Sequence, residues 1–503
     1  MTFAATSRDR AALAAICLSA LMLGLEITSI PAILPTLEQV LPADFRQLQW
    51  IMNAYTIAMT TCLMAMGTLA DRFGRKRVFM IGTIVFGLTS VACGLASNAP
   101  LLIGARFLQG ASAAAMLACQ VAALSHQFSG GRARARAFGW WGIVFGAGLG
   151  FGPVVGGVIM AAASWQWVFL IHGVLALVTF GLASAGLAES TDPKAERIDL
   201  AGMATLSLAV FCLVYLITQG EALGRHNPPG LLMAAAGILS FLIFLVVESR
   251  QARPMFDFRA FRSRPFTGAL IGASGMNFSF WPFVVYLPIY VQAGLGYDAI
   301  TAGLILLAYT LPTLVVPPFA ERLLMRRGPG FVIPLGLLAI GSGFAVMRLA
   351  MAAGAVGWLT VVPGCVLAGL GLGLTNTPVT NTATGALPAE RSGMASGMDM
   401  SARMISLAVN IAVMGFILLH GVAASLGQAM PQGTPVQALW RAAEAVAAGN
   451  LGGAEAAGMS LVTARQALEQ GFAWVTLYGA ACALLMAALS FAIFGRPKLS
   501  PAH

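Results

Sequence analysis

Long apolar runs separated by short polar segments dominate this chain of 503 residues. A helix needs about 20 apolar residues to cross the hydrocarbon core of a bilayer, which is roughly 30 Å thick. Judged by that length, the pattern predicts fourteen membrane-spanning helices. The first apolar run is too long for the core of a signal peptide, so it is also predicted to be a span. The predicted spans cover residues 11–35, 47–70, 78–97, 99–125, 137–162, 165–187, 200–219, 229–248, 266–292, 300–324, 331–352, 357–386, 392–420 and 471–494.

The composition supports the same conclusion. Hydrophobic residues make up 58% of the chain and charged residues only 10%, whereas a soluble protein carries roughly a quarter charged residues. The excess apolar side chains must face lipid, so we expect an all-α polytopic membrane protein. The seven cysteines stand singly within apolar runs, a spacing that suits neither a disulfide framework nor a metal site.

The basic residues predict how the spans are oriented, because cytoplasmic segments carry an excess of Lys and Arg. An even number of spans puts both termini on one side. Most of the 29 Lys and Arg residues fall on that side, which is therefore predicted to be cytoplasmic. The exceptions are Arg46, Arg225, Arg441 and Arg465 on the opposite side and Arg106, Arg348 and Arg403 inside spans.

One long hydrophilic stretch, at roughly 421–470, falls on the outer side. It is rich in Ala, Gly and Gln, with helical patterns at Val436–Ala448 and at residues 461–469. It is either an amphipathic cap or a tolerated loop.

The loop after the second predicted span, residues 67–77, reads Gly-Thr-Leu-Ala-Asp-Arg-Phe-Gly-Arg-Lys-Arg. One interpretation is a tight turn with charges that set topology. The other is a charged latch, because Asp71 at the membrane face can accept from a basic partner or lie at a helix N-terminus. A weaker echo, Pro-Pro-Phe-Ala-Glu-Arg at residues 317–322, hints at duplicated halves.

The fifth predicted span is dense in glycine. Near four-residue spacing lets helix backbones approach closely, and a proline inside the span is expected to kink it. This density favours a specialised hinge or seal over generic packing. The residues are Gly139, Gly148, Gly152, Pro153, Gly156 and Gly157.

Four ionisable residues inside spans are candidates for function, because burying a charge in a bilayer is costly. At about 1.5 Å per residue, Glu26 lies roughly 22 Å from the cytoplasmic start of its span and Arg106 roughly 10 Å from the outer face. The two therefore lie at similar depth and could pair or share a water-filled cavity. Asp399 and Arg403 have the i, i+4 spacing of an ion pair. Pairing solely for insertion is the alternative; we favour function for Glu26.

Two further sets are weaker candidates. His172, near the outer end of the sixth span, could titrate near neutral pH, although a hydrogen-bonded packing histidine is favoured. Aromatic residues of the ninth span form either an interfacial belt or the wall of a cavity for an apolar or cationic solute. The candidate substrate residues are Tyr55, Gln109, Trp281, Tyr286 and Tyr290.

Together these motifs resemble the major facilitator superfamily, and most closely its 14-span drug:proton antiporter branch (EmrB/QacA type). Residues 67–77 match the superfamily's signature loop almost position by position. Residues 106–110, Arg-Phe-Leu-Gln-Gly, look like the fourth-span motif, whose arginine is implicated in proton coupling. The fifth-span glycines reproduce the spacing of the antiporter motif, which marks exporters more than importers.

The chain departs from the branch at a few positions. Glu26 stands where the first-span motif usually has aspartate, and Pro31 replaces an expected asparagine. Met400 and Met404 flank Arg403 in place of asparagine and glutamine. These differences bear on local helix geometry and on substrate range.

The resemblance covers essentially the whole chain and implies the major facilitator fold, with two six-helix bundles and two inserted spans. The bundles would be residues 1–190 and 261–503, the latter with the outer loop at about 421–470, and residues 191–260 would hold the inserted spans and linkers. The chain would be a multi-pass protein of the plasma (inner) membrane with both termini in the cytoplasm.

The resemblance also implies proton-coupled export of small, hydrophobic or cationic compounds by alternating access. The coupling residues would be Glu26, Arg106, Asp399 and Arg403, and the cytoplasmic gate would be Gly67, Asp71, Arg72, Gly74 and Arg75. We expect no cofactor besides the proton gradient, no catalytic activity and no nucleic acid. Partners would be the small-molecule substrate, protons and lipid, with the chain a monomer apart from an adaptor in the periplasm, which is left open.

Two alternatives stay open. On the same fold, the chain could be a dedicated exporter or a proton symporter for a single metabolite. A non-transporting membrane enzyme or sensor would need a catalytic cluster or an appended domain, and the sequence indicates neither.

Overall fold

A computed structural model describes residues 6–128, 131–191, 200–223, 228–251, 258–354, 357–386, 392–430, 435–452 and 459–495. Every regular element within these ranges is a helix. In this described part of the chain, eleven helices are long and apolar enough to cross a membrane, or up to twelve when a bent pair is taken as one span. The prediction of an all-α polytopic membrane protein is confirmed.

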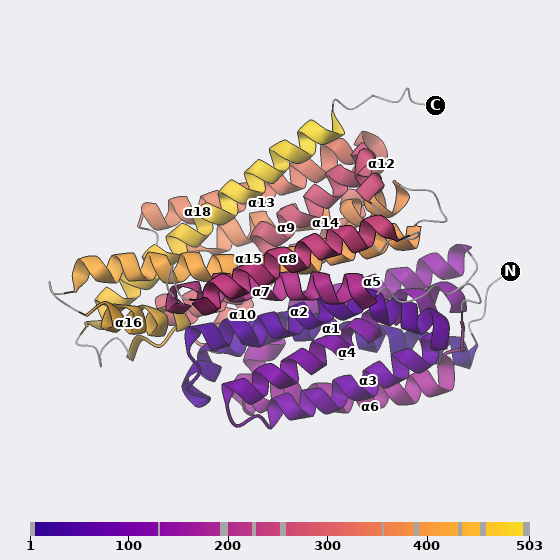
Figure 1. The fold of residues 1–503 in the computed structure, drawn as a ribbon, viewed down its shortest axis with the longest axis horizontal. Coiled ribbons are helices and arrows are strands. Elements are labelled where there is room, and N and C mark those ends of the chain that lie inside the picture. The colour runs from indigo at the N-terminus through magenta and orange to yellow at the C-terminus, as the bar shows by residue number, and fades with distance from the viewer. Residues whose placement is uncertain are drawn as a thin grey trace. The chain divides into compact units, whose positions relative to one another are not determined.

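The chain divides into two compact units. The first comprises Met1–Ala43, Trp50–Leu216 and Gly220–Ser249, so α7 and α8, predicted as an insertion, group with the N-terminal helices. The helices of this unit (Figure 1) are α1 (Ser7–Val40), α2 (Phe45–Phe73), α3 (Arg75–Gly94), α4 (Ala99–Gln127), α5 (Gly131–Ala162), α6 (Gln166–Gly186), α7 (Leu200–Leu223) and α8 (Pro228–Arg250).

The second unit comprises Asp44–Gln49, Ile217–Gln219 and Arg250–His503. Its α-helices are α9 (Arg264–Ile289), α10 (Ala299–Thr310), α11 (Pro312–Val315), α12 (Pro317–Arg327), α13 (Pro329–Ala352), α14 (Val362–Gly385), α15 (Ser392–Ala429), α16 (Val436–Ala448) and α18 (Leu461–Phe494). Short 3-10 or π segments are η1 (Phe258–Arg262), η2 (Tyr290–Gly294) and η3 (Gly357–Thr360).

Each predicted span coincides with helix, yet not every one meets the membrane-crossing criterion. The apolar part of α7 is a shorter helical stretch, Ala204–Ile217, and α2 is not one of the eleven helices that are long and apolar enough. The tenth predicted span is bent by 45° between Ala299–Val315 and Pro317–Arg327. Pro312 and Pro317 each begin a new helical segment there, because proline supplies no backbone N–H to continue the helix before it.

Within the predicted outer segment at about 421–470, the helical patterns at Val436–Ala448 and at residues 461–469 are confirmed as α16 and the start of α18. α15 continues to Ala429 and α18 begins at Leu461, because a helix does not have to end where its apolar stretch ends. Between them, α16 buries Ala443, Val446 and Ala447 and contacts α15 and α18. Of the two interpretations, the amphipathic cap describes this segment better.

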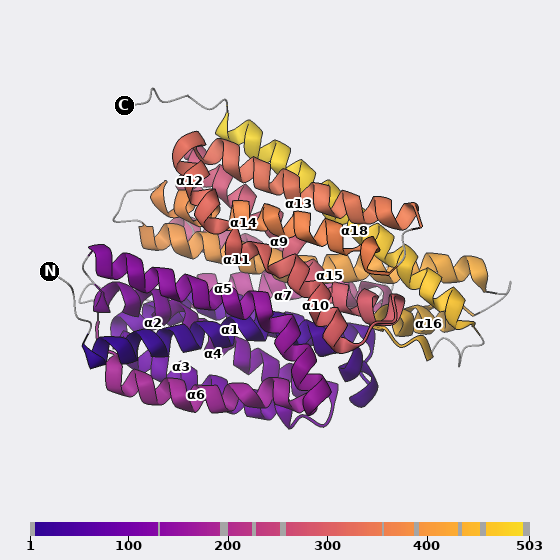
Figure 2. The same cartoon turned by 180° about the vertical axis from the view of Figure 1, so that it is seen from behind.

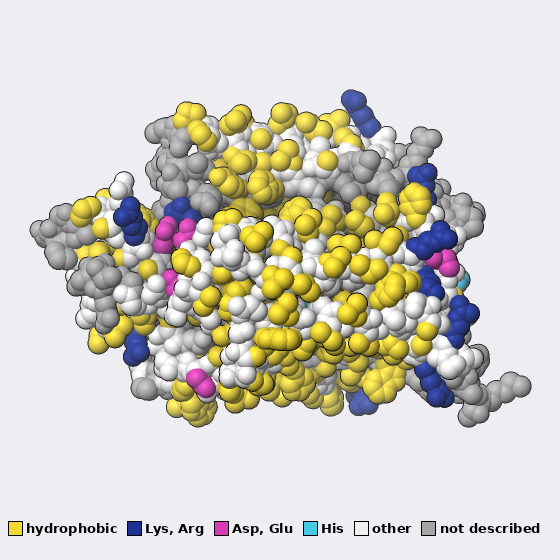
Figure 3. Space-filling model, turned by 90° about the horizontal axis from the view of Figure 1, so that it is seen from below, with side chains coloured by type: hydrophobic (Ala, Val, Ile, Leu, Met, Phe, Trp, Pro, Cys, Tyr) yellow, Lys and Arg dark blue, Asp and Glu magenta, His cyan; other side chains and the backbone are white. Residues whose placement is uncertain are grey.

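Apolar side chains are abundant on the outside of the protein, as a lipid-facing surface requires. In Figure 3 apolar side chains are spread over the visible face. On the first unit, for example, Leu88 and Leu177 expose 66% and 75% of their surface. In water such a surface would be unfavourable; in a bilayer it faces lipid tails.

Glycines on both helices bring α1 and α5 into close contact, and the two lie side by side (Figure 2). A Cβ added to Gly24, Gly148 or Gly156 would lie 2.7, 2.7 or 2.8 Å from a carbonyl oxygen of the opposite helix. One added to Gly152 would overlap the hydroxyl of Thr28. The predicted close backbone approach is therefore present, and it fixes α1 in rotation and depth. The role of these glycines as a hinge stays a prediction.

We expect Gly148→Ala to destabilise the first unit by about 1–3 kcal/mol, because the new methyl group would meet rigid backbone on α1. Gly142→Ala on the same helix is the matched control, since nothing lies within 4 Å of its added Cβ; it should be neutral or slightly stabilising through helix propensity. Thermal unfolding of the purified protein in detergent measures both. Equal melting temperatures for the two variants would contradict the tight α1–α5 contact.

Candidate functional site

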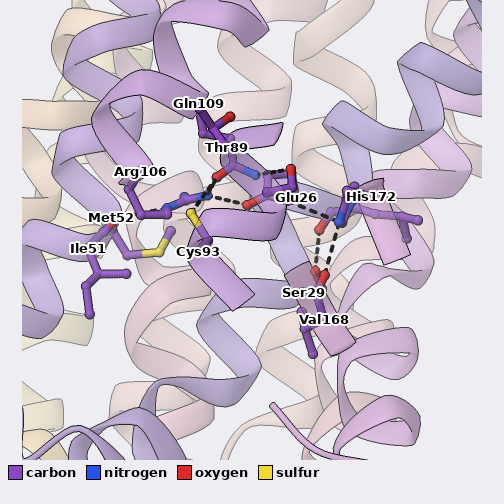
Figure 4. Close-up of polar contacts among 12 residues, drawn as sticks. Glu26, Ser29, Ile51, Met52, Thr89, Cys93, Arg106, Gln109, Val168 and His172 are labelled. Atoms are coloured by element: carbon purple, nitrogen blue, oxygen red, sulfur yellow. Dashed lines mark hydrogen bonds and ion pairs between the residues drawn. The ribbon is translucent and has the colours of Figure 1, made fainter. Parts of the chain in front are cut away.

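A buried ion pair lies inside the first unit (Figure 4). Glu26 of α1 and Arg106 of α4 are both fully buried, and Arg106 Nη1 donates to Glu26 Oε1. The pairing that similar membrane depth suggested is therefore present. Because an isolated buried charge is very costly, each residue permits the other to stay ionised.

Arg106 is held by more than its carboxylate partner. Its Nε donates to the backbone oxygen of Ile51 on α2 over 3.0 Å, and Nη1 also donates to Gln109 Oε1 over 2.7 Å. The guanidinium carbon lies 4.3 Å from the ring centroid of Tyr55 and 6.0 Å from that of Phe169, both within cation–π range. The arginine therefore keeps a fixed position without depending on Glu26 alone.

Gln109 extends the cluster to α3. Its Nε2 donates to Ser90 Oγ over 2.8 Å, and the Cys93 thiol lies 3.7 Å from its Oε1. Gln109 was a candidate substrate residue; the structure places it as the residue that orients Arg106. Any contact of Gln109 or Tyr55 with substrate stays a prediction.

His172 of α6 completes the cluster. Its Nδ1 lies 3.0 Å from the backbone oxygen of Val168 and 3.4 Å from Glu26 Oε2, and its ring meets Phe86 edge-on at 6.0 Å. The predicted hydrogen-bonded packing histidine is present, but its contact with Glu26 was missed. A depth argument could have found it, because His172 lies about 9 Å along α6 from the helix start, much as Arg106 does in α4.

Several polar atoms of this cluster are buried without a hydrogen-bond partner among the described residues. They are Glu26 Oε2, Tyr55 OH, Arg106 Nη2 and His172 Nε2. Such atoms are uncommon in native structures and point to a functional role.

The second unit contains its own buried ion pair. Arg403 Nε donates to Asp399 Oδ2 over 3.0 Å within α15, as the i, i+4 spacing predicted. Its Nη1 and Nη2 donate to Asn376 Oδ1 and Thr380 Oγ1 of α14, over 2.6 and 3.0 Å. The pair thus also joins two helices, and a role in proton coupling stays a prediction.

The aromatic residues of α9 lie mostly inside the second unit. Tyr286 donates its hydroxyl hydrogen to the backbone oxygen of Ile411, and the ring of Tyr290 stacks on Phe472 with centroids 4.8 Å apart. Both tyrosines are buried, and Trp281 is half-buried. Burial argues against an interfacial belt at the two tyrosines; their contact with substrate stays a prediction.

The charged loop between α2 and α3 contacts the segment after α6. Gly74 has a φ of +112°, which favours glycine, and a Cβ there would lie 2.6 Å from the Glu189 carboxylate. Glu189 Oε1 accepts from the backbone N–H of Lys76 over 3.0 Å, and the backbone N–H of Arg75 donates to Ser190 over 3.0 Å. Sequence analysis missed Glu189, which lies more than a hundred residues after its partners.

The remaining predicted gate and hinge residues are placed as follows. Gly67 lies in α2 and Arg72 is exposed, whereas the side chain of Asp71 lies outside the described residues. In α5, Pro153 and Gly157 are buried, and the surroundings of Gly139 lie outside the described residues.

The family model described as Major Facilitator Superfamily matches residues 16–411. This chain belongs to the Major Facilitator Superfamily. The match spans the Glu26 cluster, the charged loop, the α1–α5 contact and the Asp399–Arg403 pair. It places the chain in a family of carriers rather than of enzymes.

Curated relatives are similar over most of the chain. "Multidrug resistance protein Stp" of Mycobacterium tuberculosis (strain CDC 1551 / Oshkosh) is 29% identical over 82% of this chain and 76% of its own length. "Tetracenomycin C resistance and export protein" of Streptomyces glaucescens is 32% identical over the same shares. "Multidrug efflux pump LfrA" of Mycolicibacterium smegmatis (strain ATCC 700084 / mc(2)155) is 27% identical over 97% of both chains.

A solved structure supports the fold. The "Crystal structure of D-xylose-proton symporter" matches with a TM-score of 0.64, covering 99% of this chain and all of that one. At 12% identity, this likeness shows that the chain has the major facilitator fold and says nothing about its substrate.

A double-mutant cycle tests the buried pair of this major facilitator protein. Arg106→Gln alone should destabilise the protein by about 3–5 kcal/mol, because it leaves Glu26 charged and unpaired in the interior. Adding Glu26→Gln should recover part of that loss, as measured by thermal unfolding in detergent. The control combines Arg106→Gln with Asp399→Asn, since Asp399 lies in the other unit. The destabilising effects of these two substitutions should add. Additivity in both cycles would contradict a direct Glu26–Arg106 interaction.

Proposed function

We propose that this protein exports small hydrophobic or cationic compounds in exchange for protons, by alternating access. Membership of the major facilitator superfamily supports transport. The names of relatives similar over most of the chain, which refer to multidrug resistance, export and efflux, support export as its direction.

The observation that carries the proton-coupled part is the burial of Glu26. Its carboxylate lies in a membrane helix against Arg106 and next to His172, and one of its oxygens has no hydrogen-bond partner among the described residues. A carboxylate in a membrane interior needs a cation beside it to stay charged and is otherwise least costly as the neutral acid. It is therefore the group proposed to take up and release a proton during transport.

The chemistry of coupling follows from that pair. A proton reaching Glu26 removes its negative charge, so its attraction to Arg106 or to a cationic substrate weakens. Arg106 then keeps its contacts with the Ile51 carbonyl and with Gln109. Protonation thus changes what Glu26 binds without releasing Arg106 from its position. Asp399 and Arg403 are proposed as a second coupling pair.

Topology and surroundings form part of the same proposal. Fourteen spans, with both termini in the cytoplasm of the plasma (inner) membrane, are supported by helices at every predicted span and by the positions of Lys and Arg. The proton gradient is the proposed energy source, with no cofactor. The chain is proposed to work as a monomer; an adaptor in the periplasm would be an addition to it.

The alternative is a dedicated exporter or proton symporter of one metabolite on the same fold. The close contact along α1 and α5, made by glycines with the antiporter spacing, favours export. Uptake assays with labelled nutrients discriminate, because a symporter would accumulate its solute inside vesicles when the gradient is directed inward.

We expect Glu26→Gln to abolish export driven by a pH gradient while preserving counterflow, the exchange of labelled for unlabelled substrate with no net proton movement. The amide keeps the shape of the side chain but cannot take part in the proton cycle. Ethidium, a hydrophobic cation, in proteoliposomes with an imposed pH gradient provides the measurement. Asp44→Asn is the control: it removes an exposed carboxylate that caps α2, and asparagine caps equally well. Full gradient-driven export by Glu26→Gln would falsify the role given to Glu26.

Asp71 is proposed to hold the cytoplasmic side closed while the transporter is open to the outside. Losing one charge-assisted hydrogen bond, worth about 1.5–3 kcal/mol, should reduce transport per molecule by about tenfold or more in Asp71→Asn. Surface expression and thermal stability should stay near wild type. Unchanged transport per molecule would reduce this loop to a topological signal.

A further inference from the structure

The Glu26 centre contains a second group that can carry a proton. His172 is 1% exposed, and its Nδ1 faces two acceptors, the Val168 carbonyl oxygen and Glu26 Oε2. When Glu26 is ionised, neither acceptor can donate. The ring hydrogen of neutral His172 must therefore be on Nδ1, which leaves Nε2 as a bare acceptor.

Nε2 has no hydrogen-bond partner among the described residues, and further buried polar atoms without such a partner lie towards the start of the same helix. These are Trp165 Nε1 and Gln166 Oε1, about 9–11 Å from His172 along the axis of α6. Trp165 is seven residues before His172, so the two lie on nearly the same face of the helix. Unpartnered polar atoms thus lie both at the N-terminal end of α6 and at the imidazole.

We propose that His172 is a proton-transfer residue, which takes a proton on Nε2 from the side of the α6 N-terminus and passes its Nδ1 proton to Glu26. This inference rests on the proposed proton-coupled export and adds the route by which Glu26 is protonated.

The proposed step balances in protons and charge. A proton from water bonds to Nε2, and the Nδ1–H bond breaks as the proton moves to Glu26 Oε2. The ring is neutral before and after, with its hydrogen now on Nε2, and the cluster has gained one proton, which resides on Glu26. Release of that proton on the other side of the membrane, with return of the ring to its first tautomer through water, completes the cycle.

The charged and titratable groups around His172 are compatible with this step. α1 contributes Glu26, α4 contributes Arg106, and α3 contributes the Cys93 thiol beyond Gln109. Between residues 137 and 162, α5 has no ionisable side chain. Arg106 is a permanent cation beside Glu26 and stays charged throughout the step.

Two substitutions separate protonation from packing. In His172→Asn the amide nitrogen can replace Nδ1–H as a donor but cannot be protonated; His172→Phe keeps a ring against Phe86 and has no nitrogen. Both are compared with wild type in proteoliposomes, using ethidium, for gradient-driven export as a function of external pH and for counterflow. His126→Asn, an exposed histidine at the end of α4, is the control.

We expect both His172 variants to lose tenfold or more of gradient-driven export at external pH 7, the scale of a lost proton-transfer group. They should regain part of it at pH 5.5, where the higher proton concentration makes up for the missing transfer group. Counterflow in His172→Asn should stay within twofold of wild type, and His126→Asn should match wild type throughout.

Three results would overturn the assignment or its basis. Wild-type export and pH profile in either His172 variant would exclude proton transfer, while equal loss of counterflow and export in His172→Asn would show a structural role. Both leave proton-coupled export by the wild type standing. A wild type whose ethidium export ignores the pH gradient would instead overturn the proposed function, and with it this inference.

Discussion

The free energy of a buried charge governs this structure. A carboxylate cannot be placed in the interior of a membrane protein without a partner, and Glu26 obtains one only because five helices meet around it. α1 carries the carboxylate, α4 the arginine, α2 and α3 the groups that hold the arginine, and α6 the histidine. The cluster is therefore a constraint on how these helices pack, as well as the proposed proton-coupling site.

The contact between α1 and α5 supplies the precision that the cluster needs. Gly24 and Gly148 allow their helices to touch at backbone distance, so α1 has little freedom to rotate or slide. Glu26 lies between residues that form this contact, since Gly24 and Thr28 precede and follow it closely in the helix. A glycine pattern that looks like packing alone thus also determines where a carboxylate lies.

Much of this could be predicted from the sequence, for reasons that differ from residue to residue. Hydropathy predicts the helices because the thickness of the bilayer determines how many apolar residues a span needs. The pairing of Glu26 with Arg106 was predictable because both lie on regular helices, whose constant rise per residue gives the depth of each side chain. The i, i+4 spacing predicted the Asp399–Arg403 pair in the same way. Glu189 was not predicted because it follows the end of a helix. There the chain has no regular repeat from which the position of a side chain can be calculated. The helices α15 and α18 extend beyond the predicted spans 392–420 and 471–494, because helix ends are set by capping and tertiary packing, not by polarity.

The distance between Glu26 and Arg106 along the chain has a consequence for how the protein is made. They are 80 residues apart, so at a synthesis rate of about 5–20 residues per second Glu26 leaves the ribosome about 4–16 s before its partner. The first helix must therefore enter the bilayer while its carboxylate has no arginine beside it, and the neutral acid is then the form of lowest cost. Only after the fourth helix arrives can the carboxylate become charged. Assembly of the first unit thus begins with Glu26 in the protonated form that the proposed transport cycle also uses.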